Sequence, residues 1–180
     1  MIIAIDPNKR KFSFKCACCG NIHEGGPSFS YDKPFEYFGV PDEDRESCIR
    51  INSDLCVINE SVFLIRTTLA IPILETDDDF LWGVWVSQSK ESFDRYVDTY
   101  ETDQSGDVSF GWLNVRMPGY TANDAEPVYL AVDVHWGPDR PELVFHQHEN
   151  HQLAIDQREG ISWDKAVELA TLLQHPPSCS

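Results

Sequence analysis

The segment from Phe80 to Val86 constrains the fold of this chain more than any other feature. Its seven residues are all apolar or glycine, with no charged side chain among them. Neighbouring side chains of a β-strand point to opposite faces of the sheet. A strand that is apolar on both faces is therefore typical of a central strand covered on both sides. The sequence therefore predicts a sheet that has other parts of the chain packed against both of its faces.

Other segments predict the remaining secondary structure. Apolar or alternating patterns predict strands at residues 55–58, 62–73, 108–116, 127–136 and 141–148. Apolar residues at helical spacing predict helices at 89–100, 153–159 and 162–173, with Ser89 and Ser162 as caps and Gly160 as a stop signal. The pattern predicts an α+β fold, a single domain over residues 1–180 in which helices flank a largely antiparallel sheet.

Composition excludes several classes of protein. The chain has 180 residues, 42% of them hydrophobic, so it can bury a sizeable core and is not intrinsically disordered. No stretch approaches the roughly 20 apolar residues of a membrane-spanning helix. The formal net charge of −16 disfavours nucleic acid as a partner, because phosphates would be repelled. We expect Trp82, Trp85 and Trp112 to lie in the core rather than to form a ligand platform.

A cysteine cluster near the N-terminus is the sharpest local signal. Cys16 and Cys19 have C-x-x-C spacing, and His23 follows four residues after Cys19. Gly20 suits a tight turn, because a side chain at that position would crowd the backbone. Thiolates and imidazoles in this arrangement are ligands of structural zinc. The sequence therefore predicts an N-terminal zinc-knuckle-like turn, for which Cys56 or Cys48 would supply the fourth ligand.

Two other interpretations of the cysteines stay open. They can be ordinary buried thiols in a metal-free turn, or Cys16 and Cys19 can be a redox pair. The apolar run at the N-terminus is too short for a signal peptide, so we expect a cytoplasmic protein with reduced thiols.

A second cluster contains His146, His148 and His151. If the first two lie on one strand, their side chains share a face and can bind a catalytic metal. A solvated strand edge in an acidic protein is the interpretation that we favour.

Short motifs that are specific in combination are spread along most of the chain. They are Cys16-x-x-Cys19-Gly20-x-x-His23, residues 53–58, residues 63–66, Ile71-Pro72, residues 82–87, Phe93, residues 110–113, residues 118–120, Arg140-Pro141, His151-x-Leu153-Ala154 and Gln157-x-x-Gly160-Ile161. Through these motifs the chain resembles, over about residues 12–175, the bacterial family known as domain of unknown function 2199.

The resemblance implies little about activity, because the family has no established one. It implies that Cys56 rather than Cys48 completes the zinc site. It also implies that His151 and Gln157 are better site candidates than His146 and His148. The chain departs from the family pattern at Cys18, an extra thiol, and at Gln152, where we expect proline.

The favoured function is a non-catalytic protein-binding module with a structural zinc site. Its acidic surface suits a basic protein partner through charge complementarity. Bacterial immunity proteins, which block a toxin, are an analogy in size and charge alone. The sequence assigns no oligomeric state.

Two alternatives come from other classes. The first is an enzyme acting on a small anionic substrate, with His151 as the acid–base group and Arg66 holding the anion. That site requires Asp54, Arg66, Trp85, His151 and Gln157 to converge. The second is a thiol-redox sensor that uses Cys16 and Cys19.

Overall fold

The computed structural model describes residues 2–15, 19–121 and 127–174. Within these ranges the strands are β1 Ile2–Asp6, β2 Lys11–Lys15, β3 Ile22–Gly25, β4 Ser28–Ser30, β5 Ile49–Ile51, β6 Leu55–Ile58, β7 Val62–Pro72, β8 Asp79–Gln88, β9 Val108–Val115, β10 Val128–His135 and β11 Glu142–Phe145. The helices are η1 Phe35–Gly39, η2 Asp42–Asp44, α1 Arg45–Cys48, α2 Lys90–Asp98, α3 Gln152–Glu159 and α4 Trp163–Gln174, where η marks 3₁₀ helices.

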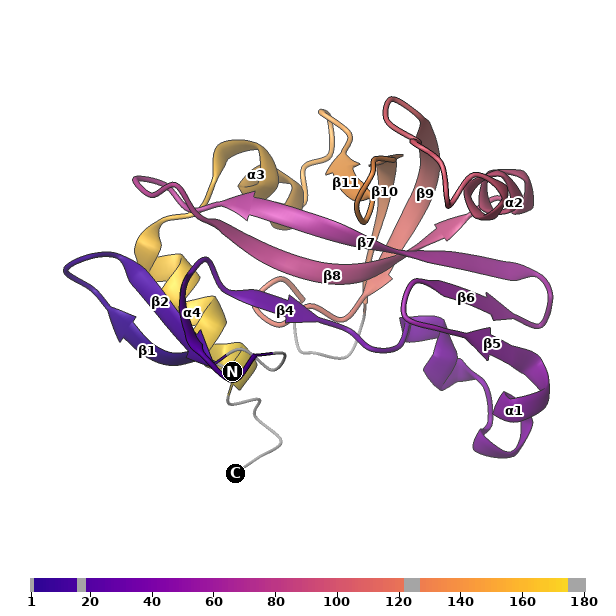
Figure 1. Ribbon diagram of the computed structural model, residues 1–180, viewed down its shortest axis with the longest axis horizontal. Helices are drawn as coiled ribbons and strands as arrows, with labels where there is room; N and C mark the ends of the chain where they lie inside the picture. The colour runs from indigo at the N-terminus through magenta and orange to yellow at the C-terminus, as the bar shows by residue number, and fades with distance from the viewer. Residues whose placement is uncertain (1, 16–18, 122–126, 175–180) are drawn as a thin grey trace.

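Five strands form a closed barrel in the order β7-β8-β9-β10-β11, and β11 returns to β7 (Figure 1). The β7–β8, β8–β9, β9–β10 and β10–β11 pairs are antiparallel, whereas the closing β11–β7 pair is parallel, with Glu142 opposite Thr68. The predicted α+β fold is therefore wrong. The protein is mostly β, and its short helices do not flank an open sheet.

The length of β7 and β8 makes this closure possible. One edge of β7 pairs with β6 over residues 62–65 and then with β11 at Thr68, while its other edge pairs with β8. The free edge of β8 is likewise shared, by β4 at residues 81–83 and by β9 at residues 86–88. A strand that changes partners half-way can belong both to a barrel and to an extension beyond it.

The main core fills the barrel. Alternate residues of β8 point inward, and Phe80, Trp82, Val84 and Val86 are fully buried there. The prediction of a strand at 80–86 covered on both faces is confirmed, because Trp85, on the opposite face, is buried in a second core. This second core contains Val40, Cys56, Ile58, Leu64 and Trp85, and Cys48, Ile49 and Ile51 pack against it.

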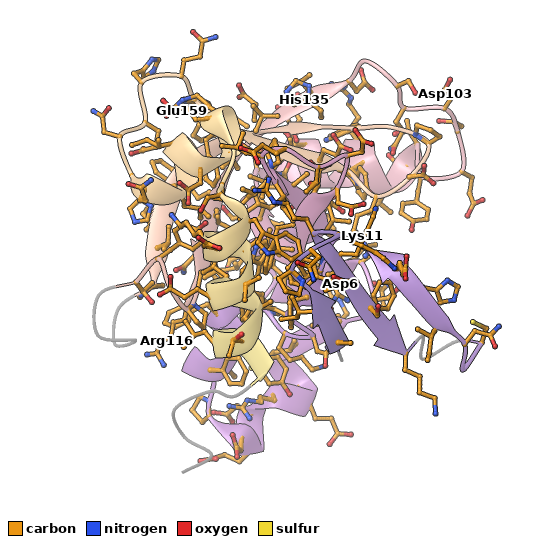
Figure 2. The ribbon with its side chains drawn as sticks, turned by 90° about the vertical axis from the view of Figure 1, so that its left-hand side faces the viewer. Asp6, Lys11, Asp103, Arg116, His135 and Glu159 are labelled. Carbon is orange, nitrogen blue, oxygen red and sulfur yellow. The ribbon has the colours of Figure 1, made fainter. Side chains whose placement is uncertain are left out.

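Three of the helices follow the predicted ranges. Ser89 caps α2, with its Oγ accepting from Ser92 N at 3.1 Å, and Gly160 ends α3 at φ +81°. Figure 2 shows α4 running beside the β1–β2 hairpin, where the Phe12 and Trp163 rings lie 4.6 Å apart. In the described part of the chain, no helix is long and apolar enough to span a membrane.

No zinc-knuckle-like turn is seen in the described part of the chain, and Cys16 and Cys18 of the predicted turn lie outside it. The described residues on either side of positions 16–18 belong to a three-stranded antiparallel sheet, β1-β2-β3. Phe14 lies opposite His23, and Lys15 opposite Ile22. The ladder between β2 and β3 places His23 on a strand, so the expected fold class is corrected here as well.

Candidate binding surface and cavity

The predicted zinc ligands are only partly brought together. Cys19 is exposed, and its Sγ lies 3.2 Å from His23 Nε2. Cys16 lies outside the described residues. Among the residues that the structure describes, no three His, Cys, Asp or Glu side chains are grouped in a way that could hold a metal ion.

Cys56, the predicted fourth ligand, lies on β6 in the second core and is fully buried. Figure 1 draws β6 at the opposite end of the long axis from the β1–β2 hairpin. Burial raises the pKa of the Cys56 thiol to about 11, and the nearby charge of Glu36 adds to the effect. A buried thiol with a raised pKa is a poor nucleophile. Cys48, the alternative, packs against the same core.

Asp54 and Arg66 come together in one cluster, in which Arg140 is ion-paired to Asp54 and the Arg66 guanidinium is ion-paired to Asp32. Arg140 donates to Asp54 Oδ1 from Nη2 at 2.6 Å and from Nε at 3.1 Å. Arg66 N donates to the Asp54 carbonyl at 2.8 Å, and Arg66 Nη1 donates to Ser53 O at 3.2 Å. Burial raises the pKa of Asp54, but hydrogen bonds from Ser53 and Arg140 outweigh it and leave that pKa below its ordinary value.

His151 and Gln157 lie elsewhere, on α3, and their polar atoms are used within the fold. His151 Nδ1 accepts from Leu153 N at 3.2 Å and so caps the helix. Gln157 accepts from Phe145 N at 2.9 Å and donates to Leu143 O at 2.7 Å. These two bonds satisfy backbone groups at the edge of β11. We call the place where β11 pairs with β7 the seam of the barrel. In the described residues, no hydrogen bond or ion pair joins His151 or Gln157 to Asp54 or Arg66.

The outer face of β9 and β10 carries three exposed aromatic side chains, Tyr129, Trp112 and Phe110, and His146, just after β11, adjoins Phe110. We call these four residues the aromatic row. The Trp112 and Tyr129 rings stack in parallel with centroids 4.8 Å apart, and Phe110 meets Trp112 edge-on at 5.6 Å. Tyr129 is 59% exposed, Phe110 49% and Trp112 38%, so the prediction that Trp112 lies in the core is wrong.

One end of the row is charged. The His146 ring lies 5.9 Å from that of Phe110, and His146 Nε2 is 3.2 Å from Asp133 Oδ1. Figure 2 labels His135 and Arg116, which mark the two ends of the β9–β10 pair that carries the row.

Next to the other end of the row lies a cavity of about 640 Å³, between the segment 31–39 and the outer faces of β8 and β9. Asn114 links the two features, because it lines the cavity and lies opposite Tyr129 in the β9–β10 ladder. The walls are largely aromatic, from Tyr31, Phe35, Phe38 and Trp85. Trp85 Nε1 donates to Tyr31 O at 2.8 Å, which fixes the indole that forms the floor of this region.

Two oxygen atoms of residues that line the cavity have no partner. Asn114 Nδ2 donates to Glu36 Oε1 at 2.8 Å, and this contact defines the amide orientation. Glu36 Oε2 and Asn114 Oδ1 are then both buried without a hydrogen bond. In the described ranges only Arg66 Nε and Trp82 Nε1 share that condition among buried side-chain atoms. Buried polar atoms are normally paired, so each exception calls for an explanation.

Comparison with known proteins yields one match. The family described as an uncharacterized protein conserved in bacteria (DUF2199) matches residues 15–161. The chain belongs to the DUF2199 family. The suspected family is thereby confirmed, over a shorter range than the expected 12–175. No curated protein and no solved structure matches the chain.

The DUF2199 motifs directed attention to residues that the fold itself uses, such as Asp54, His151 and Gln157. Sequence reasoning missed Glu36 and Asn114. Glu36 lies in a stretch for which the sequence predicted no strand or helix, and Asn114 is one polar residue in a strand. No spacing rule connects two residues 78 positions apart. The single available signal was the alternation of Phe110, Trp112 and Asn114 with buried residues, which places them on one face of β9.

Proposed function

We propose that this DUF2199 protein is a non-catalytic binding module that docks a basic protein partner on its aromatic row. The observation that carries the proposal is the exposed, mutually stacked set of Phe110, Trp112 and Tyr129 on a chain with a net charge of −16. Large aromatic side chains are enriched at the centres of protein interfaces, and polar residues surround them.

Charge complementarity supports a basic partner. Asp133 and Glu142 lie on the same outer face as the row, with Asp133 opposite Phe110 and Glu142 opposite His135 in the ladders. Acidic residues at one end of an apolar patch speed association with a cationic surface and select against acidic competitors. A second copy of this chain would meet the same negative charge, which disfavours self-association through this face.

The geometry of the rings favours a protein surface over a nucleic acid or a sugar. Trp112 and Tyr129 stack on each other with an interplanar angle of 3°, so each ring has one face already covered. Nucleic-acid platforms present open ring faces beside cationic grooves, and this chain is strongly acidic. An irregular apolar protein surface can pack against edges and faces alike.

Affinity capture from a bacterial lysate, followed by reconstitution with the purified partner, tests this proposal. We expect the chain to capture a basic protein whose affinity falls at least tenfold between low and high salt, as for a steered complex. Trp112→Ser should abolish capture, whereas Val97→Ser, at an exposed apolar position on α2, should not. Equal capture by both variants, or no capture at any salt concentration, would refute the proposal.

The structural zinc site also stays a proposal. Cys19 Sγ and His23 Nε2 lie 3.2 Å apart, which supports the proposal that both bind the same zinc ion. Native mass spectrometry should find one zinc per chain, lost in Cys19→Ser; retention of zinc in Cys56→Ser would exclude Cys56 as a ligand. The cytoplasmic location, the immunity-protein analogy and the redox sensor stay predictions. The enzymatic alternative does too, although His151 Nδ1 is occupied as a helix cap.

A further inference from the structure

A small polar hollow of about 240 Å³ lies where separate segments of the chain meet. Its lining comes from the end of α2 and the residues after it (Tyr96, Tyr100 and Gln104), from the loop between β10 and β11 (residues 137–140) and from Asp54, just before β6. At about 30 Å³ per water molecule, the hollow has room for about eight waters. A single six-membered ring that carries hydroxyl groups is a ligand of this size.

Two buried residues of the lining each present a polar atom that the fold does not use. Tyr96 is 3% exposed and Gln104 is 5% exposed. Gln104 Nε2 donates to Tyr96 O at 3.0 Å and to Thr99 Oγ1 at 2.6 Å, which leaves Gln104 Oε1 as an acceptor. Among the described residues, neither this oxygen nor Tyr96 Oη has a hydrogen-bond partner, and neither belongs to the fully buried atoms without one. Both atoms therefore remain open to a ligand in the hollow.

The hydroxyl group of Tyr96 stays protonated at neutral pH. Burial raises the pKa of Tyr96 to about 12, and the nearby Tyr100 and Asp54 add to this rise. Arg140 opposes the rise without cancelling it. A protonated phenol can donate one hydrogen bond and accept others, whereas the amide oxygen of Gln104 can only accept. The hollow thus offers a donor and an acceptor on two residues that contact each other.

The charges around the hollow disfavour an anion. Arg140 and Asp54 are ion-paired at 2.6 Å, so their charges largely cancel. Asp139 is exposed and makes no ion pair within the described residues, which leaves one negative charge on the lining. A cation would be attracted to this charge, but it only donates and would leave the Tyr96 hydroxyl without an acceptor. A neutral hydroxyl group both donates and accepts, and it satisfies both atoms.

We propose that this hollow binds a neutral cyclic polyol of the size of one monosaccharide. One ligand hydroxyl accepts from Tyr96 Oη, a neighbouring one donates to Gln104 Oε1, and the half-exposed ring of Tyr100 covers an apolar face of the ligand. The inference stands apart from the aromatic-row proposal, because it rests on other residues and needs no protein partner.

Nuclear magnetic resonance titration tests the ligand class. The probes are D-glucose, D-galactose and D-mannose, each compared with its own 6-phosphate. We expect at least one hexose to bind with a millimolar dissociation constant, and its 6-phosphate to bind at least about fivefold more weakly because the added charge meets Asp139. No signal shifted by any of the three hexoses at tens of millimolar, or a 6-phosphate that binds as tightly as its parent hexose, would overturn the proposal.

Removal of one oxygen atom tests the central contact. Tyr96→Phe keeps the buried ring and should weaken the hexose about tenfold, the equivalent of one hydrogen bond. Because Tyr96 Oη has no partner within the described residues, the variant should unfold in urea at the parent's midpoint or above it. Tyr37→Phe, the same change outside the hollow, should leave hexose binding unchanged. Unchanged binding by Tyr96→Phe, or an equal loss in both variants, would overturn the assignment.

A second variant tests the charge argument. Asp139→Asn should keep the affinity for the hexose within about twofold and bring the affinity of the 6-phosphate closer to it, since the repelling carboxylate is gone. Asp77→Asn, at an exposed position away from the hollow, should leave the difference between hexose and phosphate as in the parent. An unchanged difference in Asp139→Asn would contradict the role given to this carboxylate.

The same spectra separate this site from the aromatic row. A bound hexose should shift the backbone amide signals of Gly137 and Arg140 and leave the Trp112 indole signal unaffected. Trp112→Ser should bind the hexose as the parent chain does. Loss of hexose binding in this variant would contradict the assignment to the hollow, whereas loss of protein capture alone would concern only the aromatic row.

Discussion

Two hollows of this molecule use their polar groups in opposite ways. The smaller one, about 240 Å³, is lined by Asp54, Arg140 and polar neighbours, and Asp54 and Arg140 are paired with each other. The larger, about 640 Å³, has aromatic walls and two buried oxygens without partners. A saturated pair holds segments of the chain together and has little left to offer a ligand, so the polyol proposed for the smaller hollow depends on Tyr96 and Gln104 instead.

The contrast extends to the family motifs. Arg140-Pro141, His151 and Gln157 belong to the pattern by which the DUF2199 family can be recognised in this chain. The structure uses Arg140 to bind Asp54, His151 to cap α3 and Gln157 to satisfy β11. These residues stabilise the barrel and its seam. The unsaturated pair, Glu36 and Asn114, has no comparable sequence signature.

The largest expected effect is at the seam. Gln157→Leu leaves the buried Phe145 N and Leu143 O without the partners that the side chain provides. We expect a loss of about 2–4 kcal/mol in the free energy of unfolding, measured by urea denaturation. Gln147→Leu, the same change at an exposed site, should cost less than about 0.5 kcal/mol. A loss below about 1 kcal/mol in Gln157→Leu would show that the seam does not depend on this amide.

The Asp54 cluster should show a pH-dependent effect of intermediate size. Because the pKa of Asp54 is lower in the folded state than in the unfolded chain, its stabilisation is present above the ordinary aspartate value and is lost as the pH falls through the folded value. Asp54→Asn should cost about 1 kcal/mol at pH 7, a value discounted for the partly exposed Arg140.

Urea titrations between pH 7 and pH 2 check this expectation. The difference between parent and variant should shrink toward acid pH, while Asp77→Asn, at an exposed tip, should show no such trend. A difference that stays constant over the whole range would mean that the carboxylate charge is not what stabilises the cluster.

The aromatic row should contribute less to stability than the seam. Trp112 is partly exposed, and its stacking on Tyr129 is worth about 0.5–1.5 kcal/mol beyond the area that the ring buries. Trp112→Ser should therefore fold normally and lose about 1–2 kcal/mol in urea. A larger loss, or a loss of cooperativity, would mean that the row is structural and would weaken the case for a docking surface.

The smallest effect on stability should come from the unsaturated pair. The double variant Glu36→Met/Asn114→Leu replaces both members of a partly satisfied pair by apolar side chains, which is often neutral or stabilising. We expect it to match or exceed the parent in urea, while Glu36→Met alone is less stable because Asn114 then loses its partner.

A double variant destabilised by more than about 2 kcal/mol would show that Glu36 and Asn114 belong to the architecture, as Asp54 and Arg140 do.

The sequence by itself determined where most strands and helices lie. The apolar residues of 80–86 and the helical spacing at 89–100 report which local faces are buried, and β8 and α2 follow them closely. Membership of the DUF2199 family was likewise readable from short motifs. Each of these signals is local, because the buried face of a strand or helix must carry apolar residues at the spacing of that element.

Only the tertiary structure decided which strands pair and which polar atoms stay unpaired. A strand with alternating apolar residues has the same sequence pattern in an open sheet and in a barrel. The sequence therefore could not indicate that β11 pairs with β7, and the predicted fold class was wrong. Strand pairing also placed His23 in a ladder, and no zinc-knuckle-like turn is seen among the described residues. Glu36 and Asn114 meet across 78 positions, and their unmet acceptors exist only because long-range packing excludes water from both.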